Sequence, residues 1–442
     1  MTKKKSSAQG DFRYAVGNAK VPWQAVGEYF KKDDVLEVIK FLLPDTQGSD
    51  RYKASFGEVR KAVANLARES GNATKLTLGK KVQEAEQLAK DYLKVKHACF
   101  LSNWTAGMEI GYKLSGLRPG DEVIMPAVTF IATMAYPLMI GAKVVFADID
   151  PKTANLDPAD VARKITARTK VIVPVHIGGC PCDMDPIMEL ASKHSIYVME
   201  DAAHGLGGMY RGRALGTIGH FGGYSLHEVK NINSFGEGGI LVSNMDCGEQ
   251  FARARFLGLD FSRQIKDWLY DITPLADRFG RPQVPGNHSA MEIQGLGFIR
   301  QMKRLDGIIA ARKKAAEYMN GVLAEESGII PEKDDTAKTY GTHHLYLLHI
   351  NPKKAGGNIQ TLKKKLTEKG LTCITHFGPM YRFNIMKQLG YDENKIASTC
   401  PVTEDMFYNC YTHLPLYPLT LSQLEYQART IVETVREMKK GV

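Results

Sequence analysis

One carboxylate and one amine stand out because both lie at the edges of apolar, strand-like runs. Asp201 ends the run IYVMED at 196–201, and Lys230 lies in a Gly-rich stretch that leads into GGILVSN at 238–244. Asp201 on its own is explained equally well as a cap of the next turn, and a single lysine is usually a solvated surface residue. Together at one edge of a sheet they suit pyridoxal phosphate. This cofactor needs an amine for its Schiff base and an acid that keeps its ring nitrogen protonated.

A third requirement of that cofactor is a phosphate cup, which proteins build from backbone N–H groups at a helix N-terminus and from nearby hydroxyls. The stretch LSNWTAGMEIGYKL at 101–114 predicts a turn that opens a helix, with Thr105 in its first turn. Ser225, a few residues before Lys230, can supply another hydroxyl. In this order along the chain, the three features favour a pyridoxal phosphate site.

The elements that must position these residues are short apolar runs that alternate with helix-length amphipathic stretches. The expected strands are EVIMP at 122–126, KVVFADID at 143–150, KVIVPVH at 170–176, IYVMED at 196–201 and GGILVSN at 238–244. Between them, DPADVARKI at 157–165 and DPIMELASKH at 185–194 each open with an Asp cap and a Pro in the first turn. This alternation predicts an α/β fold with a mostly parallel sheet between helices, and ligands bind beyond the C-terminal ends of such strands.

The character of the chain changes after about residue 250. One long helix is expected from about 290 to 320, followed by a strand at 342–350, a helix at 358–370 ended by Gly370, and a final helix at 421–439. We therefore predict a loose basic tail over 1–20, a large domain over 21–295 and, over 296–442, the linking helix with a small α+β domain.

Composition sets the class of the protein. The 442 residues are 44% hydrophobic and 24% charged, which is typical of a globular chain. We expect no membrane span, and the basic start MTKKKSSAQG has no apolar core of a secretory signal, so a cytoplasmic protein is expected. The net charge is +10, but the basic residues are dispersed among acids, so no nucleic-acid partner is expected. Cys180 and Cys182 lack the spacing of a zinc site, and we predict no metal.

With these residues in place, the sequence resembles the DegT/DnrJ/EryC1/StrS family of pyridoxal-phosphate-dependent sugar aminotransferases, over roughly residues 76–440. The resemblance is strongest in EDAAHGLGGMYRGRALGTIGHFGGYSLHEVKNINSFGEGGILVSN at 200–244, where the family's Ser-x-His-x-x-Lys-Asn signature stands as Ser225, His227, Lys230 and Asn231. The resemblance implies a fold-type I transferase, whose large domain has a mostly parallel sheet of seven strands. It also implies a homodimer with shared active sites.

The resemblance also implies residue roles. Lys230 would be the internal-aldimine lysine and then the base that moves a proton on the substrate, and Asp201 would be the partner of the ring nitrogen. His204 matches the position that contacts the cofactor's phenolic oxygen. Phe130 matches the aromatic residue that stacks on the ring.

The remaining matches concern the phosphate. Trp104 and Thr105 correspond to the Gly-Thr pair of the family's phosphate cup, together with Ser225, and Asn287 matches an Asn that reaches the phosphate from the neighbouring subunit. Three departures accompany these matches: Trp104 replaces the usual Gly, Ser289 replaces the usual Arg, and 44–76 is an extra segment. Its helical pattern at 55–70 fits either a packed extra helix or a lid for an unusual acceptor.

The implied reaction is transfer of an amino group from L-glutamate to a keto sugar by ping-pong chemistry, and we expect this sugar to be linked to a nucleotide. A keto-cyclitol or a long-chain sugar acid is the alternative acceptor. Two rivals are a pyridoxamine-dependent sugar dehydratase, in which His replaces the lysine, and a non-catalytic cofactor-binding protein.

Overall fold

The structure is a computed structural model that describes residues 30–70, 76–260, 262–263, 265, 270–332, 335–373 and 377–441. The predicted tail at 1–20 lies outside the described residues. The chain divides into two compact units, 1–79 and 80–442, and each is described by itself. Within the described residues, no helix is long and apolar enough to cross a membrane.

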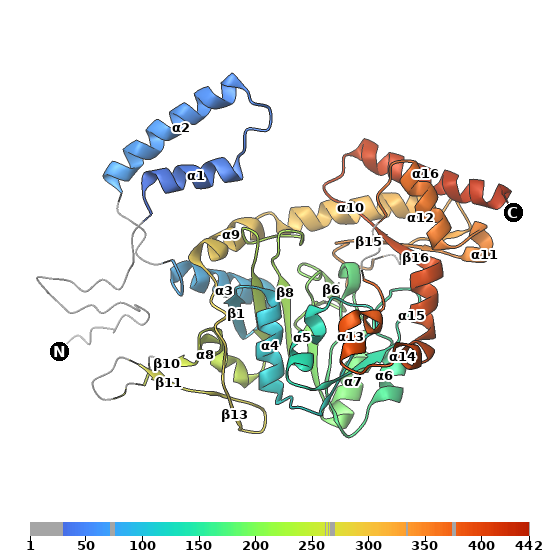
Figure 1. The fold of residues 1–442 in the computed structure, drawn as a ribbon, viewed down its shortest axis with the longest axis horizontal. Helices are drawn as coiled ribbons and strands as arrows, with labels where there is room; N and C mark the ends of the chain where they lie inside the picture. The colour runs from blue at the N-terminus through green and yellow to red at the C-terminus, as the bar shows by residue number, and fades with distance from the viewer. Residues whose placement is uncertain are drawn as a thin grey trace, which may run out of the picture. The chain divides into compact units, whose positions relative to one another are not determined.

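The centre of the larger unit is a seven-stranded sheet (Figure 1). Its order is β1–β9–β8–β5–β4–β2–β3, and only β9 runs opposite to the others, since it pairs antiparallel with both β1 and β8. This confirms the predicted fold class. The bounds are β1 His97–Leu101, β2 Glu122–Pro126, β3 Lys143–Ala147, β4 Thr169–Ile172, β5 Tyr197–Asp201, β8 Phe221–Ser225 and β9 Gly239–Ser243.

Helices cover both faces of this sheet, which explains why strands such as β2 have apolar residues on both faces. In β2, Val123 and Met125 pack in the core under α4, whereas Ile124 packs in the core under α6 and α7. The helices around this sheet are α3 Lys80–Leu93, α4 Trp104–Ser115, α5 Ala132–Met139, α6 Pro158–Lys164, α7 Met184–His194 and α8 Phe251–Arg255.

The two predicted Asp caps differ in outcome. The Asp157 carboxylate accepts from Ala159 N at 2.9 Å and caps α6 as expected. In α7 the expected cap Asp185 is wrong, because the helix begins at Met184 and its N-cap is Asp183, two residues before the expected cap. Asp185 therefore lies in the first turn, where its carboxylate forms ion pairs with Arg211 and Arg213.

The single helix expected from 290 to 320 is also wrong. It is two helices, α9 Glu292–Met302 and α10 Leu305–Leu323, and the chain turns at Lys303 and Arg304. Met302 and Leu305, on either side of this turn, pack in the same core against β1, β8 and β9. The apolar spacing therefore continues through the turn, and it does not reveal the break.

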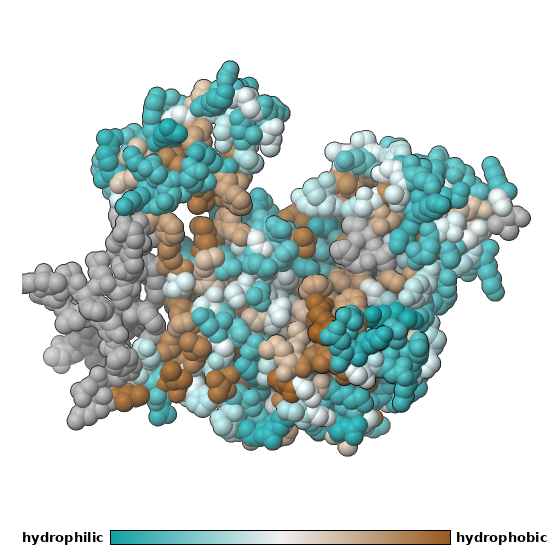
Figure 2. All heavy atoms as spheres, viewed as in Figure 1, coloured by the Kyte–Doolittle hydropathy of each residue, from teal (hydrophilic) through white to brown (hydrophobic). Residues whose placement is uncertain are grey.

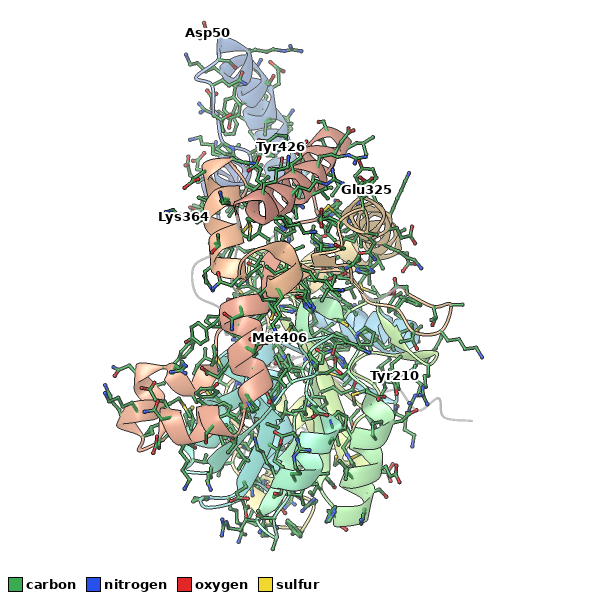
Figure 3. The ribbon with its side chains drawn as sticks, turned by 90° about the vertical axis from the view of Figure 1, so that its right-hand side faces the viewer. Asp50, Tyr210, Glu325, Lys364, Met406 and Tyr426 are labelled. Carbon is green, nitrogen blue, oxygen red and sulfur yellow. The ribbon has the colours of Figure 1, made fainter. Side chains whose placement is uncertain are left out.

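The last part of the chain builds a second, three-stranded antiparallel sheet, ordered β14–β15–β16. The second half of α10 and the final helix α16 pack on it. Glu325, labelled in Figure 3, lies just after α10. Its carboxylate pairs with Arg429 of α16 at 2.7 Å. The outer side of these helices is mostly hydrophilic in Figure 2, as expected for amphipathic helices. The strands and helices from residue 329 to 440, including short helices outside this sheet, are β14 Ile329–Ile330, β15 Tyr346–Ile350, α11 Pro352–Ala355, α12 Ile359–Glu368, α13 Asn384–Gln388, α14 Glu393–Ser398, α15 Pro401–Asp405, β16 Tyr411–Leu414 and α16 Leu421–Lys440.

Three small hairpins complete the larger unit: β6 Met209–Tyr210 with β7 Arg213–Ala214, β10 Leu259–Asp260 with β11 Asp271–Ile272, and β12 Leu275–Ala276 with β13 Pro282–Gln283. The predicted domain boundary near residue 295 stays a prediction, because α10 contributes to the cores of both sheets.

The smaller unit contains α1 Lys32–Leu42 and α2 Asp50–Glu69. Ser49 caps α2 by accepting from Tyr52 N, and α2 spans the helix expected at 55–70. Only Leu36 of α1 is buried, and α2 has no buried residue. The helices α1 and α2 belong to the unit 1–79, whereas the prediction included the segment 44–76 in the large domain.

Candidate active site

Asp201 ends β5 at the C-terminal edge of the large sheet and is only 4% exposed. Three groups donate hydrogen bonds to its carboxylate. Trp104 Nε1 and Ala203 N donate to Oδ1 at 2.9 and 3.2 Å, and Thr133 Oγ1 donates to Oδ2 at 2.9 Å. A buried carboxylate held by this many donors has a fixed orientation.

Trp104 is the first residue of α4, and its indole lies in a slot between this helix and β8. A Cβ on Gly107 would come within 2.5 Å of the indole ring, and a Cβ on Gly223 within 2.2 Å. Gly223 is also the residue of β8 that pairs with Asp201. The two glycines therefore leave the space that the indole fills beside the carboxylate.

The N-terminus of α4 forms a cradle against β9. The Asn103 side chain caps the helix by accepting from Ala106 N at 2.9 Å, whereas the first N–H groups of a helix have no intrahelical acceptor. A Cβ on Gly239 would lie 2.4 Å from Trp104 N, so this glycine lets the strand approach the helix start. Ser225 pairs with Gly239 across the two strands, and Thr105 is exposed.

Lys230 lies in the loop between β8 and β9, with its Nζ 3.0 Å from His204 Nε2. The loop closes on itself through Leu226 N to Gly238 O at 2.8 Å and Ser234 N to Leu226 O at 3.1 Å. Burial lowers the pKa of Lys230 below its ordinary value, although the charge of Asp201 opposes this shift. An amine with a lowered pKa loses its proton at a lower pH. The neutral amine is the form that attacks a carbonyl group.

His204 is buried and belongs to a stack of rings. Its ring is stacked on His344 with centroids 4.4 Å apart, and Phe377 lies 5.8 Å away on centroids. His344 Nδ1 lies 2.9 Å from Asn231 Oδ1, and Asn231 Nδ2 donates to the carbonyl of His204 at 3.3 Å. His204, beside the lysine, is therefore fixed by its neighbours.

Phe130 and Asn287 lie outside the hydrogen-bonded groups around Asp201 and Lys230. Phe130 is 58% exposed, and its ring meets Phe377 edge-on at 6.3 Å. Asn287 forms an isolated antiparallel bridge with Phe256, and its Oδ1 accepts from Ser289 N at 3.2 Å. Among the described residues, Asn287 has no hydrogen bond with Lys230 or Asp201.

These residues fit pyridoxal phosphate. An amine with a lowered pKa, a buried carboxylate at the neighbouring strand end and a helix start against a tightly packed glycine supply the three groups that the cofactor requires. The backbone N–H groups of the α4 start suit a phosphate.

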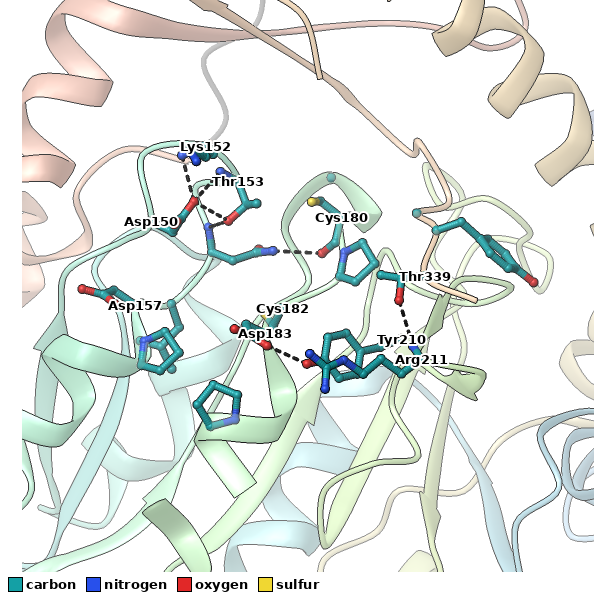
Figure 4. A pocket seen from close by; sticks show the side chains of 18 of the residues that line it. Asp150, Lys152, Thr153, Asp157, Cys180, Cys182, Asp183, Tyr210, Arg211 and Thr339 are labelled. Atoms are coloured by element: carbon teal, nitrogen blue, oxygen red, sulfur yellow. Dashed lines mark hydrogen bonds between the residues drawn. The ribbon is translucent and has the colours of Figure 1, made fainter. Parts of the chain in front are cut away.

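A cavity of about 1030 Å³ lies elsewhere in the larger unit (Figure 4). It is lined by the loops after β3 and β4, the start of α7 and residues 335–347, and it includes none of the predicted site residues. Several of its polar groups bond one another: Tyr210 Oη donates to Asp183 Oδ1, and Lys152 N donates to Asp150 Oδ1. We therefore do not assign the cofactor to this cavity.

Comparison with known proteins identifies the family. The sequence pattern of the DegT/DnrJ/EryC1/StrS aminotransferase family matches residues 58–436. The chain belongs to this family. It is an aminotransferase, and its cofactor is pyridoxal phosphate.

Its relatives in the DegT/DnrJ/EryC1/StrS family include the spore coat polysaccharide biosynthesis protein SpsC of Bacillus subtilis, 32% identical over 83% of this chain and 91% of that protein. GDP-perosamine synthase of Caulobacter vibrioides is 34% identical over 74% and 84% of the two chains. Among solved structures, the PLP form of a putative sugar aminotransferase of Streptococcus pneumoniae has a TM-score of 0.71 and 25% identity, with 86% of this chain and 96% of that chain covered.

Sequence reasoning did not single out Thr133 or His344. Thr133 lies three residues after Phe130, in VTFIAT at 128–133, but nothing in its spacing shows that it bonds Asp201. His344 falls in the expected strand 342–350. The strand begins only at Tyr346, and the irregular residues before it carry the contacts with His204, including Thr342 Oγ1 to His204 O at 2.6 Å. The sequence did contain a signal for these contacts, because the polar triplet THH at 342–344 precedes an apolar run.

Proposed function

We propose that this aminotransferase transfers an amino group from L-glutamate to a keto sugar linked to a nucleotide. Support for the acceptor comes from relatives whose names specify sugars: GDP-perosamine synthase, and the UDP-4-amino-4-deoxy-L-arabinose–oxoglutarate aminotransferase of Shewanella sediminis, 31% identical over 81% of this chain. The name of the second relative also includes oxoglutarate, the keto acid that glutamate becomes on losing its amino group.

Pyridoxal phosphate supplies an electron sink that stabilises negative charge on the donor's α-carbon. We assign Lys230 two roles: it would hold the cofactor covalently, and it would then act as the base that moves a proton on the substrate. Its amine suits both roles because its pKa is lowered and it lies beside His204. Asp201 would keep the ring nitrogen protonated, and His204 would contact the phenolic oxygen. The observation that carries the assignment is the placement of Lys230, His204 and Asp201 at adjoining strand ends.

The other predicted residues keep their proposed roles. Phe130, with its largely exposed ring, would stack on the cofactor ring. The start of α4 at Trp104 and Thr105, with Ser225, would bind the phosphate through N–H groups and hydroxyls. Asn287 would reach the phosphate of a neighbouring subunit, so that the enzyme is a homodimer with shared sites.

Another acceptor class is supported by one relative. The 3-amino-5-hydroxybenzoate synthase of Amycolatopsis mediterranei is 30% identical over 71% of this chain, and its name specifies an aminated ring that is not a nucleotide sugar. The alternative acceptor stays the one that the family resemblance implies, a keto-cyclitol or a long-chain sugar acid. Lys230 argues against the dehydratase reaction, in which His takes its place.

The test is the visible absorbance of the protein with pyridoxal phosphate, before and after L-glutamate is added. We expect a band from covalently held cofactor that bleaches with glutamate while 2-oxoglutarate forms. Lys230→Ala should lose this band and keep its thermal melting temperature in the absence of cofactor. A band that glutamate leaves unchanged would contradict the donor, and a band that survives in Lys230→Ala would contradict the lysine assignment. Screening keto forms of nucleotide sugars against the glutamate-loaded enzyme then tests the acceptor.

A further inference from the structure

Trp104 connects the two ends of the proposed cofactor site. Its backbone lies at the start of α4, where the phosphate is expected, and its indole Nε1 donates to Asp201 Oδ1 at 2.9 Å. The side chain is 4% exposed, and it fills the slot left by Gly107 and Gly223. An indole N–H in this environment is a donor with a fixed direction, since the ring cannot rotate away.

The hydrogen bonds to Asp201 divide unequally between its two oxygens. A carboxylate oxygen has two acceptor positions. On Oδ1 both positions are taken, by Trp104 Nε1 and Ala203 N. On Oδ2 only Thr133 Oγ1 donates among the residues that the structure describes. One acceptor position therefore remains for a donor from the cofactor, and it is on Oδ2.

We propose that Trp104 is a positioning residue, which turns Asp201 so that Oδ2 is the oxygen that meets the protonated ring nitrogen. This inference rests on the proposed function of Asp201. The hydrogen bond from the indole N–H fixes the position of Oδ1, and the hydrogen bond from the Thr133 hydroxyl fixes the rotation of the carboxylate that places Oδ2. The glycine usual at this position in the family has no side chain with which to hold the carboxylate, so this chain orients Asp201 with a group of its own.

The test compares Trp104→Phe with wild type and with Ser115→Ala. Phe keeps an aromatic ring in the slot and removes the N–H donor. Ser115 lies at the other end of α4, is buried, and donates to Tyr112 O at 2.7 Å, so its loss removes a buried hydrogen bond of the same helix far from Asp201. Two readouts are measured: the dissociation constant of pyridoxal phosphate, and the pH at which ¹⁵N-labelled bound cofactor loses the proton on its ring nitrogen.

For Trp104→Phe we expect Asp201 to turn away, so that its Oδ2 no longer faces the ring nitrogen and their hydrogen bond weakens. The dissociation constant should then rise about tenfold and the deprotonation pH of the ring nitrogen should fall by about one unit, the size expected for one hydrogen bond to a charged group. Ser115→Ala should match wild type in both. Wild-type affinity together with an unchanged deprotonation pH in Trp104→Phe would overturn the role of Trp104 and leave the proposed function intact. If the wild-type protein itself does not bind the cofactor, the proposed function fails, and this inference fails with it.

A second variant covers the case in which Trp104→Phe does not fold. Replacement of Trp104 by 3-benzothienylalanine substitutes sulfur for the indole N–H and keeps the size and shape of the ring. The same two shifts are expected, and their absence in this variant would also overturn the proposal.

Discussion

Lys230 illustrates how burial and a nearby charge act on one amine in opposite directions. Burial lowers its pKa below 10.5, and the negative charge of Asp201 raises it. Removing that charge should therefore let the pKa fall further. For Asp201→Asn in the cofactor-free protein, we expect the midpoint of Lys230 modification by a small amine-reactive reagent to move to lower pH. Peptide mass spectrometry at each pH measures the rate, and a midpoint that moves upward would contradict the assigned interaction.

Asp201→Asn also tests the residue in the loaded enzyme. Asn keeps the shape of the side chain but cannot hold a proton on the ring nitrogen, so we expect the amino-transfer rate to fall on the order of a hundredfold, as for other lost electrostatic groups. Stopped-flow absorbance of the glutamate half-reaction is the measurement. Ser115→Ala serves again as the control and should retain the wild-type rate.

At the scale of elements, the irregular segment before β15 is held by ion pairs. His343 has a left-handed backbone with φ of +46°, and its ring nitrogens lie 3.1 and 3.0 Å from the carboxylates of Glu332 and Asp335. Burial disfavours the charged ring, but the hydrogen bonds to Asp335 and Glu332 outweigh it and raise the pKa of His343 to about 9. The flanking residues Thr342 and His344 contact His204, so this clamp supports the site.

The sign of the pH dependence follows from the raised pKa. The stabilisation by His343 is fully present below pH 6.5, the ordinary value, and is lost as pH rises through about 9. The difference in free energy of unfolding between wild type and His343→Gln should then be at most roughly 3 kcal/mol near pH 6 and shrink toward pH 10. Denaturant unfolding at a series of pH values measures it. A difference that grows with pH would contradict the clamp.

The elements themselves were mostly predictable, because strands buried on both faces and capped helices leave local patterns in the sequence. The strand β2 and the cap Asp157 were predicted this way. The break between α9 and α10 was not, since the apolar spacing continues across it. The bond between Trp104 and Asp201 joins residues 97 positions apart, and no local pattern encodes such a contact. Residue types thus indicated the chemistry, whereas the orientation of the site depended on tertiary packing.

At the scale of the whole molecule, the proposed sharing of sites between subunits can be tested by mixing variants. Lys230→Ala lacks the lysine, and Asn287→Ala should lose most bound cofactor at low cofactor concentration. In a hybrid dimer, one site would combine the lysine of one subunit with the Asn of the other. Random reassociation should therefore restore about a quarter of the wild-type activity. The unmixed variants are the controls, and no recovery after confirmed subunit exchange would contradict a shared site.

The helix α10 has a consequence for how the larger unit unfolds. Leu305 and Ile309 at its start belong to the core of the large sheet, and Met319 and Leu323 near its end belong to the core of the small sheet. Between them, Arg312 Nη1 donates to the carbonyls of His343 and His344 at 3.3 and 3.1 Å. Neither core can open while this helix stays folded in the other, so the two sheets should lose their amide protection together in hydrogen exchange. A ligand bound at the edge of the large sheet would then slow exchange in β15 as well, through the rigidity of one shared helix.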